Sequence, residues 1–229
     1  MNILAIDTAL AAVSACVYDG AKGHVLAGET IALQRGHAEA LLPMIDRVMA
    51  RLEGGFGALG KIAVTVGPGS FTGIRIGISA GRAIALACGV PVVGISTLVA
   101  LAAPLLRAAD VGLVACAIDA LHGNVYVAAY VAGGRCLLSP RILPVRDAVR
   151  LLGSAQVRIA GSGAPLLAIE AWAMGMNAEV AGELIAPDIA YVAQLGLLAD
   201  PDQSPARPVY LKAADARPQQ GGRIARVIA

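Results

Sequence analysis

The sequence is poor in aromatic residues and in charge. Aromatic residues make up 3% of its 229 residues and charged residues 15%, whereas hydrophobic residues make up 57%. We therefore expect an aliphatic core of Ala, Val, Ile and Leu, in one large domain or two small ones. The formal net charge is only +2, and both signs are mixed along the chain. This balance gives no electrostatic indication of direct nucleic-acid binding.

Paired cysteines, a leader sequence and a clear membrane span are also missing. The four cysteines are far apart, without a Cys-x-x-Cys pair that would indicate zinc. Asp7 directly follows the first apolar run, so we expect no signal peptide and a reducing cytoplasm. Residues 83–106 contain no charge, but glycines and prolines divide them. This predicts a helix end, a short strand at 90–93 and a helix capped near Ser96, not a membrane span.

The most informative motif is a glycine-rich turn between an expected strand (62–66) and an expected helix (72–88). Its sequence is Gly-Pro-Gly-Ser-Phe-Thr-Gly, from Gly67 to Gly73. Backbone N–H groups at such a helix start can bind a phosphate. No lysine follows Gly73, however, as a Walker loop requires. The candidate nucleotide site combines this turn with the end of the first strand: Asp7, Thr8, Gly67, Gly69 and Ser70. An alternative is that Asp7 only caps its turn.

The order of the expected elements repeats along the chain. Three strands, a helix, a strand and a helix occur before residue 102, and the same order begins again at residue 113. This predicts an α/β fold of duplicated ribonuclease-H-like (actin-like ATPase, ASKHA) architecture with two βββαβα-type subdomains. We expect them at 1–102 and 103–229, with the last residues able to pack back on the first subdomain. A nucleotide would bind between such halves, by fold analogy alone.

Two helices of the first half carry further patterns. His37 begins the first helix, but position 41 is leucine, so the His pair at i and i+4 of a helical metal site is missing. Gly73, Gly77 and Gly81 form a row on the second helix. Each interior helical glycine costs about 1 kcal/mol relative to alanine, so the row indicates close approach of another backbone. Packing within the chain and a subunit contact explain it equally well.

Other candidate catalytic groups are weaker. Asp119 and His122 share a turn and could serve acid–base or metal chemistry, but no third ligand accompanies them. Ser70 does not lie in a Gly-x-Ser-x-Gly nucleophile motif. The residues alone therefore leave one enzymatic alternative open, an actin-like ATPase or kinase. A second alternative, an M22-type metalloprotease, is raised only by the family resemblance described next.

Three segments resemble the TsaB (YeaZ) family of bacterial tRNA threonylcarbamoyladenosine biosynthesis proteins. They are residues 3–9, 35–45 and 67–77, the last containing Gly-Pro-Gly-Ser-Phe-Thr-Gly-Ile-Arg. Residues 92–98 and 208–212 are also similar. The resemblance implies the duplicated actin-like fold. It also implies a role in placing threonylcarbamoyl on the adenosine 3′ of the anticodon, in tRNAs that read A-starting codons.

The resemblance further implies a non-catalytic scaffold that binds TsaD, a paralogue with a His-x-x-x-His metal pair. TsaE, an ATPase, would join in a ternary complex, and tRNA would be reached only through that complex. The isolated chain would form a homodimer. No cofactor of its own is expected, although ATP or ADP could bind at the interface with TsaD. The partner interface implied on the first two helices comprises His37, Leu41, Met44, Ile45, Val48, Ile74, Arg75 and Ile78.

Overall fold

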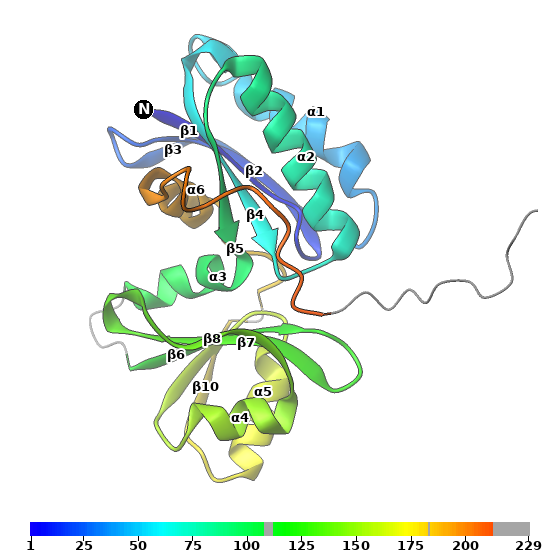
Figure 1. Cartoon of the computed structure of the whole chain (residues 1–229), viewed down its shortest axis with the longest axis vertical. Helices are drawn as coiled ribbons and strands as arrows, with labels where there is room; N and C mark the ends of the chain where they lie inside the picture. Colours follow the sequence, from blue (N-terminus) through cyan, green and yellow to red (C-terminus); the bar gives the residue numbers. More distant parts are fainter. Residues whose placement is uncertain (108–111, 183, 213–229) are drawn as a thin grey trace, which may run out of the picture.

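Two five-stranded sheets form the two lobes of the molecule (Figure 1). The computed structural model describes residues 1–107, 112–182 and 184–212. The first sheet has the order β3-β2-β1-β4-β5, and its strands are β1 (Asn2–Asp7), β2 (Ala12–Asp19), β3 (His24–Ala32), β4 (Leu59–Gly67) and β5 (Val92–Ser96). The second has the order β8-β7-β6-β9-β10, and its strands are β6 (Leu113–Asp119), β7 (Asn124–Val131), β8 (Arg135–Pro144), β9 (Val157–Ala160) and β10 (Ala178–Gly182).

The two sheets have the same pattern of strand pairing. In each, the first three strands form an antiparallel meander, and the last two add in parallel beside the first strand. The predicted duplicated ribonuclease-H-like architecture is therefore confirmed. Each copy also carries one strand and one helix beyond the predicted βββαβα pattern. In the second copy these elements are β10 and α6, which the sequence analysis did not identify.

Six α-helices and two short 3₁₀ helices connect the described strands. Their bounds are α1 (His37–Met49), η1 (Gly55–Ala58), α2 (Phe71–Cys88), α3 (Thr97–Leu106), η2 (Ala132–Gly134), α4 (Val145–Leu152), α5 (Ala164–Ala173) and α6 (Ile189–Leu198). Helix α1 continues through Pro43, whose position is exposed, while its apolar stripe faces the sheet. Strand β5 begins two residues later than predicted. Gly89 ends α2 in the left-handed conformation, and Val90 still donates its N–H to the Ala85 carbonyl.

The helices cover the sheets by a reciprocal exchange (Figure 1). One face of the first sheet packs against α1 and α2, and one face of the second packs against α4 and α5. The last helix of each copy packs on the sheet of the other copy. Ile189 and Val192 of α6 lie in the core of the first sheet, and Leu98 and Leu101 of α3 lie in the core of the second. The expected boundary at residues 102 and 103 falls inside α3.

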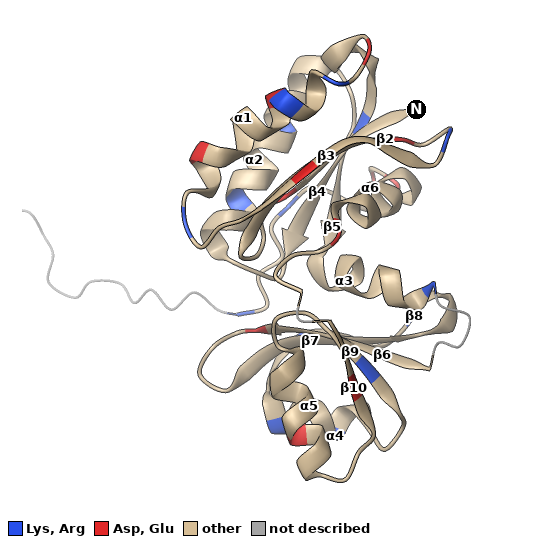
Figure 2. Cartoon of the chain, turned by 180° about the vertical axis from the view of Figure 1, so that it is seen from behind, with Lys and Arg blue, Asp and Glu red and all other residues tan. Residues whose placement is uncertain are grey.

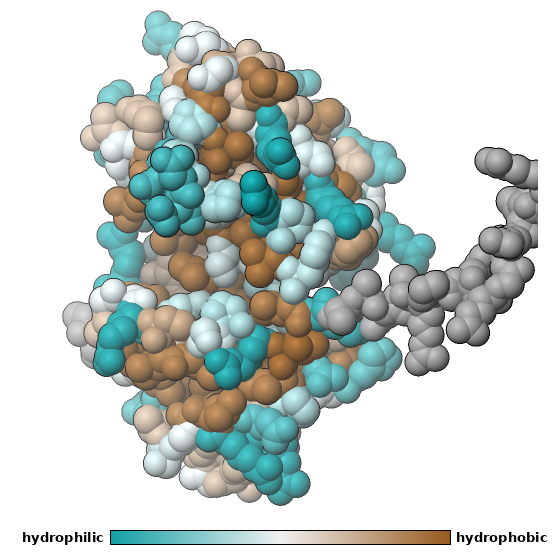
Figure 3. Space-filling view, in the orientation of Figure 1, coloured by the Kyte–Doolittle hydropathy of each residue, from teal (hydrophilic) through white to brown (hydrophobic). Residues whose placement is uncertain are grey.

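The apolar composition is visible on the surface. Charged residues are scattered over both lobes (Figure 2), and apolar surface extends across the lower lobe to its junction with the upper one (Figure 3). Among the described helices, only α2 has the length and mean hydropathy of a membrane span. Its glycine row packs on β1 and β4, as expected of a core helix. Residues 83–106 divide into the end of α2, β5 and α3, so the predicted interruption of this run is confirmed.

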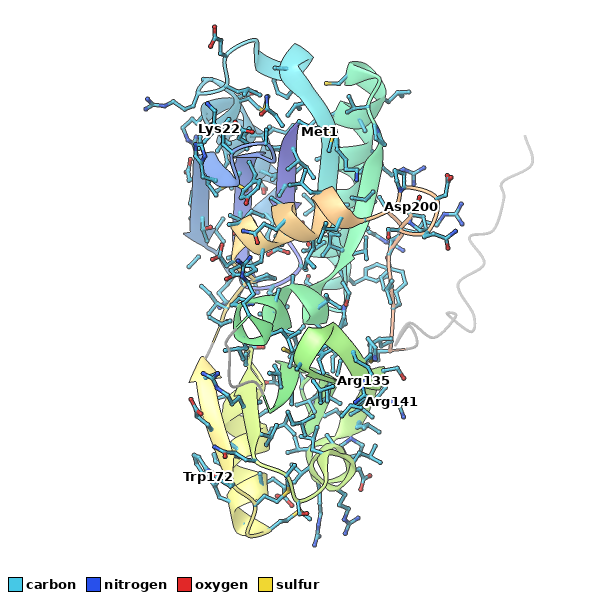
Figure 4. The ribbon with its side chains drawn as sticks, turned by 90° about the vertical axis from the view of Figure 1, so that its left-hand side faces the viewer. Met1, Lys22, Arg135, Arg141, Trp172 and Asp200 are labelled. Carbon is cyan, nitrogen blue, oxygen red and sulfur yellow. The ribbon has the colours of Figure 1, made fainter. Side chains whose placement is uncertain are left out.

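After α6 the chain returns along the first lobe as an extended segment, residues 204–211, which we call the C-terminal strap (Figure 1). It follows a turn at Asp200, labelled in Figure 4. The Gly94 N–H donates to the Ser204 carbonyl, and the Val209 N–H donates to the Val66 carbonyl. The strap therefore covers the open edge of β5 and continues to the end of β4.

Candidate functional site

Asp7 lies at the end of β1 and is completely buried. Its Oδ1 accepts hydrogen bonds from the Thr65 hydroxyl at 2.5 Å and from the Ala9 N–H at 3.1 Å. Its Oδ2 is buried and has no partner among the described residues. Burial raises the pKa of the Asp7 carboxyl to about 6, although these two hydrogen bonds and the nearby His37 act in the opposite direction. Asp7 therefore faces the interior of the protein and not an open cleft.

The glycine-rich turn packs directly on the loop that follows β1. A Cβ on Gly69 would collide with the Ala9 carbonyl oxygen, and the Ser70 N–H donates to that same oxygen at 2.7 Å. The Ser70 hydroxyl caps α2 by accepting the Gly73 N–H. At the other end of the turn, Gly67 has φ +110°, and a Cβ there would meet the Val209 carbonyl oxygen of the strap at 2.7 Å.

The glycine row of α2 is explained by packing within the chain. A Cβ on Gly73 would meet the Thr8 carbonyl oxygen, and one on Gly77 would lie 2.5 Å from the Thr8 hydroxyl oxygen. A Cβ on Gly81 would meet a methyl group of Val64. The Thr8 hydroxyl donates to the Gly73 carbonyl at 2.7 Å. The row lets α2 lie close to the ends of β1 and β4, which decides between the two explanations left open by the sequence.

These contacts restrict the space for a nucleotide phosphate at the turn, and the site predicted from Asp7, Thr8, Gly67, Gly69 and Ser70 stays a prediction. A phosphate would need free N–H groups and open space. The Ser70 N–H is already used by Ala9, and the loop after β1 occupies the space beside Gly69. Within the described part of the chain, no group of three or more His, Cys, Asp or Glu side chains could hold a metal ion.

The second copy repeats this local geometry in an open form. Asp119 ends β6, and its Oδ1 accepts the Leu121 N–H, as Asp7 accepts the Ala9 N–H. Asp119 is exposed, however, and so is His122. Leu121 and His122 adopt positive φ angles of 64° and 53°. The structure brings these two residues onto one exposed turn, without a third ligand among the described residues.

Most of the expected partner-interface residues belong to the core. Leu41, Met44, Ile45, Val48, Ile74 and Ile78 are all at most 4% exposed and face the first sheet. They cannot form a contact surface in this conformation, so that part of the expected interface is corrected. His37 is half-buried, with its Nε2 2.9 Å from the Leu10 carbonyl oxygen. Of the expected set, Arg75 is exposed.

The sequence analysis missed a cluster around Arg75. The Arg75 Cζ lies 3.7 Å from the centre of the Phe71 ring, and Arg75 Nε donates to the Tyr210 hydroxyl at 2.7 Å. The two rings lie 5.1 Å apart. The spacing of Phe71 and Arg75, four residues apart on one helix, is a signal for their contact. No local pattern connects either residue with Tyr210, which reaches them only through the strap.

The repeated sheet order, the exchanged helices and the aspartate beside a glycine turn define the duplicated ribonuclease-H-like class, to which the actin-like ATPases also belong. The profile of the family described as TsaD, tRNA N6-adenosine threonylcarbamoyltransferase, matches residues 27–199. The chain therefore belongs to the TsaD family.

Individual relatives agree with the resemblance to TsaB, which is confirmed. TsaB of Escherichia coli (strain K12) is 38% identical over 130 residues, which are 57% of this chain and 55% of that protein. TsaB of Haemophilus influenzae is 36% identical over 127 residues, covering 55% of this chain and 52% of the relative. The chain thus spans about half the length of the curated relatives it matches. The solved structure of YeaZ from Pseudomonas aeruginosa superposes with a TM-score of 0.73 at 28% identity, covering 92% of this chain and 99% of that one.

Proposed function

We propose that this chain is a non-catalytic subunit of the machinery that forms threonylcarbamoyladenosine in tRNA, and that it acts by binding TsaD. The observation that carries the proposal is the closed strand end. The chain belongs to a transferase family, yet the loop after β1 packs on its glycine-rich turn, where the Ala9 carbonyl oxygen accepts the Ser70 N–H. A member whose turn is packed in this way can contribute to the reaction through contact with a catalytic relative.

Helix α1 also favours a non-catalytic role for this chain and a catalytic role for TsaD. The resemblance gives TsaD a His-x-x-x-His metal pair on the corresponding helix. Here the helix begins at His37, and the position four residues later is Leu41, which is buried in the core of the first sheet. Helix α1 therefore cannot present two histidines to a metal ion. This favours the scaffold over the M22-type metalloprotease.

The outer faces of α1 and α2 are the proposed contact surface for TsaD. Both helices lie on the same side of the first sheet (Figure 1). Leu42 on α1 is 56% exposed, and Leu86 on α2 is 87% exposed. Two shallow hollows lie along α2. One is lined by Phe71, Arg75 and Ile76, and the other lies beside Leu86. In the absence of TsaD, this face would join two copies of the chain, and TsaE and tRNA would associate with the TsaD complex in the cytoplasm.

The decisive experiment is co-expression with TsaD from the same organism, followed by size-exclusion chromatography. Co-elution of the two proteins is expected. Leu86→Arg should abolish it, whereas Leu198→Arg should not, because Leu198 is equally exposed (86%) but lies on α6, on the opposite side of the sheet. Separate elution of the wild-type chain and TsaD would contradict the proposal.

Nucleotide binding is tested separately. The filled turn leaves the interface with TsaD as the proposed place for ATP or ADP. Calorimetry with the isolated chain should then show no heat of ATP binding, while the complex is titrated in parallel. Micromolar ATP binding with turnover by the isolated chain would favour the ATPase or kinase alternative. A stoichiometric metal in elemental analysis would favour the metalloprotease.

A further inference from the structure

Arg75 is an exposed side chain on the outer face of α2 whose guanidinium contacts two aromatic residues. Phe71 and Arg75 are four residues apart, so their side chains meet on one side of the helix. The Arg75 Cζ lies 3.7 Å from the centre of the Phe71 ring and 5.7 Å from the centre of the Tyr210 ring. Cations stack in this way on the electron-rich faces of aromatic rings. We call Phe71, Arg75 and Tyr210 the aromatic clamp.

The clamp uses residues that this chain has in short supply. The whole sequence contains two Phe and five Tyr. Nevertheless, Phe71 and Tyr210 are 52% and 43% exposed, and so they contribute little to the core. Holding a long arginine side chain in one conformation also costs rotamer entropy. Such an ordered, exposed aromatic and arginine group is the composition typical of binding hot spots.

The C-terminal strap brings Tyr210 to this position. The Val209 N–H donates to the Val66 carbonyl, and the Val209 carbonyl packs on Gly67. Tyr210 is thereby fixed beside the first turn of α2. The Tyr210 hydroxyl accepts the Arg75 Nε–H, which leaves both Nη groups of Arg75 without a partner among the described residues. Two parallel Nη donors form a planar fork that matches the two oxygens of a carboxylate.

The charges around the clamp agree with an acidic partner. Helix α2 contains no acidic residue, and its outer face carries Arg75 and Arg82. The hollow beside the clamp is otherwise lined by Thr72, Ile76 and Ser79. A partner surface that complements this face combines apolar side chains with a carboxylate opposite Arg75.

We propose that Arg75 is a carboxylate-binding anchor for TsaD, with Phe71 and Tyr210 acting as positioning residues. This inference rests on the proposed function, because it identifies the chemistry by which the same face recognises TsaD. An Asp or Glu side chain of TsaD binds the two Nη groups, and the strap keeps the guanidinium in the orientation that binding requires.

The test is calorimetric titration of the full chain and its variants with TsaD from the same organism. Arg75→Met should weaken binding about 30-fold or more, as loss of a hot spot does. Arg75→Lys should lose nearly as much, because a lysine keeps the charge but neither the fork nor the ring stacking. Tyr210→Phe, which removes only the hydroxyl, should weaken binding about 3- to 10-fold, the effect of one lost hydrogen bond. Arg82→Met, on the same helix face but outside the clamp, should weaken binding less than Arg75→Met does. Arg135→Met, at an exposed position of β8 outside the proposed contact surface, is the control and should change the affinity less than about 3-fold.

Thermal melts of all variants establish that they are folded. Equal loss from Arg75→Met and Arg82→Met would overturn the anchor in favour of general charge attraction. Wild-type affinity of Arg75→Lys would overturn the carboxylate fork. A wild-type chain that does not bind TsaD would instead overturn the proposed function itself, and a chain that binds while Arg75→Met binds equally well would overturn only the anchor.

Discussion

The two copies of the fold place an aspartate in the same local turn but in opposite environments. Asp7 and Asp119 each end the first strand of their sheet, and each carboxylate accepts the N–H of the second residue onward. Asp7 is fully buried, whereas Asp119 is exposed. Along β1, Leu4 and Ile6 pack on the side of α1 and α2, so the alternation of the strand turns Asp7, like Ile3 and Ala5, to the other face. The local hydrogen bond is therefore a property of the turn, and the close approach of α2 is a separate feature of the first copy.

The two copies also differ in the helix that follows the glycine-rich turn. Helix α2 carries glycines at every fourth position and lies against Thr8 and Val64. Helix α5 has Ala164, Leu167, Ala168 and Ala171 at its buried positions, so side chains separate it from its sheet. The helix therefore approaches its sheet more closely in the first copy than in the second.

The largest expected effect is a break in this close approach. Gly73→Ala places a methyl group against the backbone oxygen of Thr8 and should destabilise the fold by about 3 kcal/mol or more, or prevent folding. In the second copy, a Cβ on Gly161 would also meet a backbone oxygen, that of Ala117, but Gly163 at the start of α5 has more room, since a Cβ there would lie 3.1 Å from the Asp119 nitrogen. Gly163→Ala should therefore cost only about 1 kcal/mol.

Urea unfolding of the soluble variants measures the loss of stability in each case, and the soluble yield shows whether Gly73→Ala folds at all. Gly57→Ala is the control, because nothing lies within 4 Å of its added Cβ and its φ is ordinary. Equal effects of Gly73→Ala and Gly163→Ala would refute the comparison of the two copies.

The sequence predicted the duplicated fold because strand order and turn spacing are local signals that recur in both halves. It also identified the Gly73, Gly77 and Gly81 row, but not its partner. The partner, Thr8, is far away in the sequence, and only the fold brings it under α2. The interface residues failed for a similar reason, since an apolar helical stripe predicts burial without telling whether the cover is the same chain or another.

The contacts that position the strap could not be predicted from the sequence, for a different reason. Lys61 is 7% exposed on β4, and its Nζ donates to the carbonyl oxygens of Gly196, Leu197 and Ala199 at the end of α6. A lone lysine in an apolar strand gives no sign that its partners are backbone carbonyls more than a hundred residues later. This contact fixes the end of α6 and thereby the start of the strap.

The second prediction compares the two exchanged helices through Lys61. Lys61→Met leaves three carbonyls at the end of α6 without their donor and should destabilise the protein by about 2–4 kcal/mol. Amide hydrogen exchange should accelerate in α6 but not in α3, which packs on the other sheet by apolar contacts. Lys22→Met is the control, since that side chain is 72% exposed and should matter by less than about 0.5 kcal/mol. Uniform acceleration in α3 and α6 would show that Lys61 does not act on α6 specifically.

The smallest effect concerns pH and the two aspartates. Burial raises the folded-state pKa of Asp7 to about 6 from an ordinary value of 3.8, so the folded protein holds this proton more tightly than the unfolded chain. The resulting stabilisation is complete below pH 3.8 and is lost as pH rises through 6. Asp7→Asn removes the titrating group. The free energy of unfolding should therefore change less with pH, by about 2–3 kcal/mol between these limits. At neutral pH the variant should be at least as stable as the wild type.

Urea midpoints measured from pH 4 to 7.5, about the range in which this group titrates, provide the readout. Asp119→Asn removes the carboxylate at the exposed position and, like Asp7→Asn, keeps an amide oxygen that can accept the turn N–H, so the pair separates the loss of a buried charge from the loss of an exposed one. If Asp7→Asn and Asp119→Asn shift the midpoint equally at every pH, burial does not distinguish the two strand ends. If only Asp7→Asn changes the slope, the buried carboxylate at the strand end of the first copy is a charge that the fold would be more stable without.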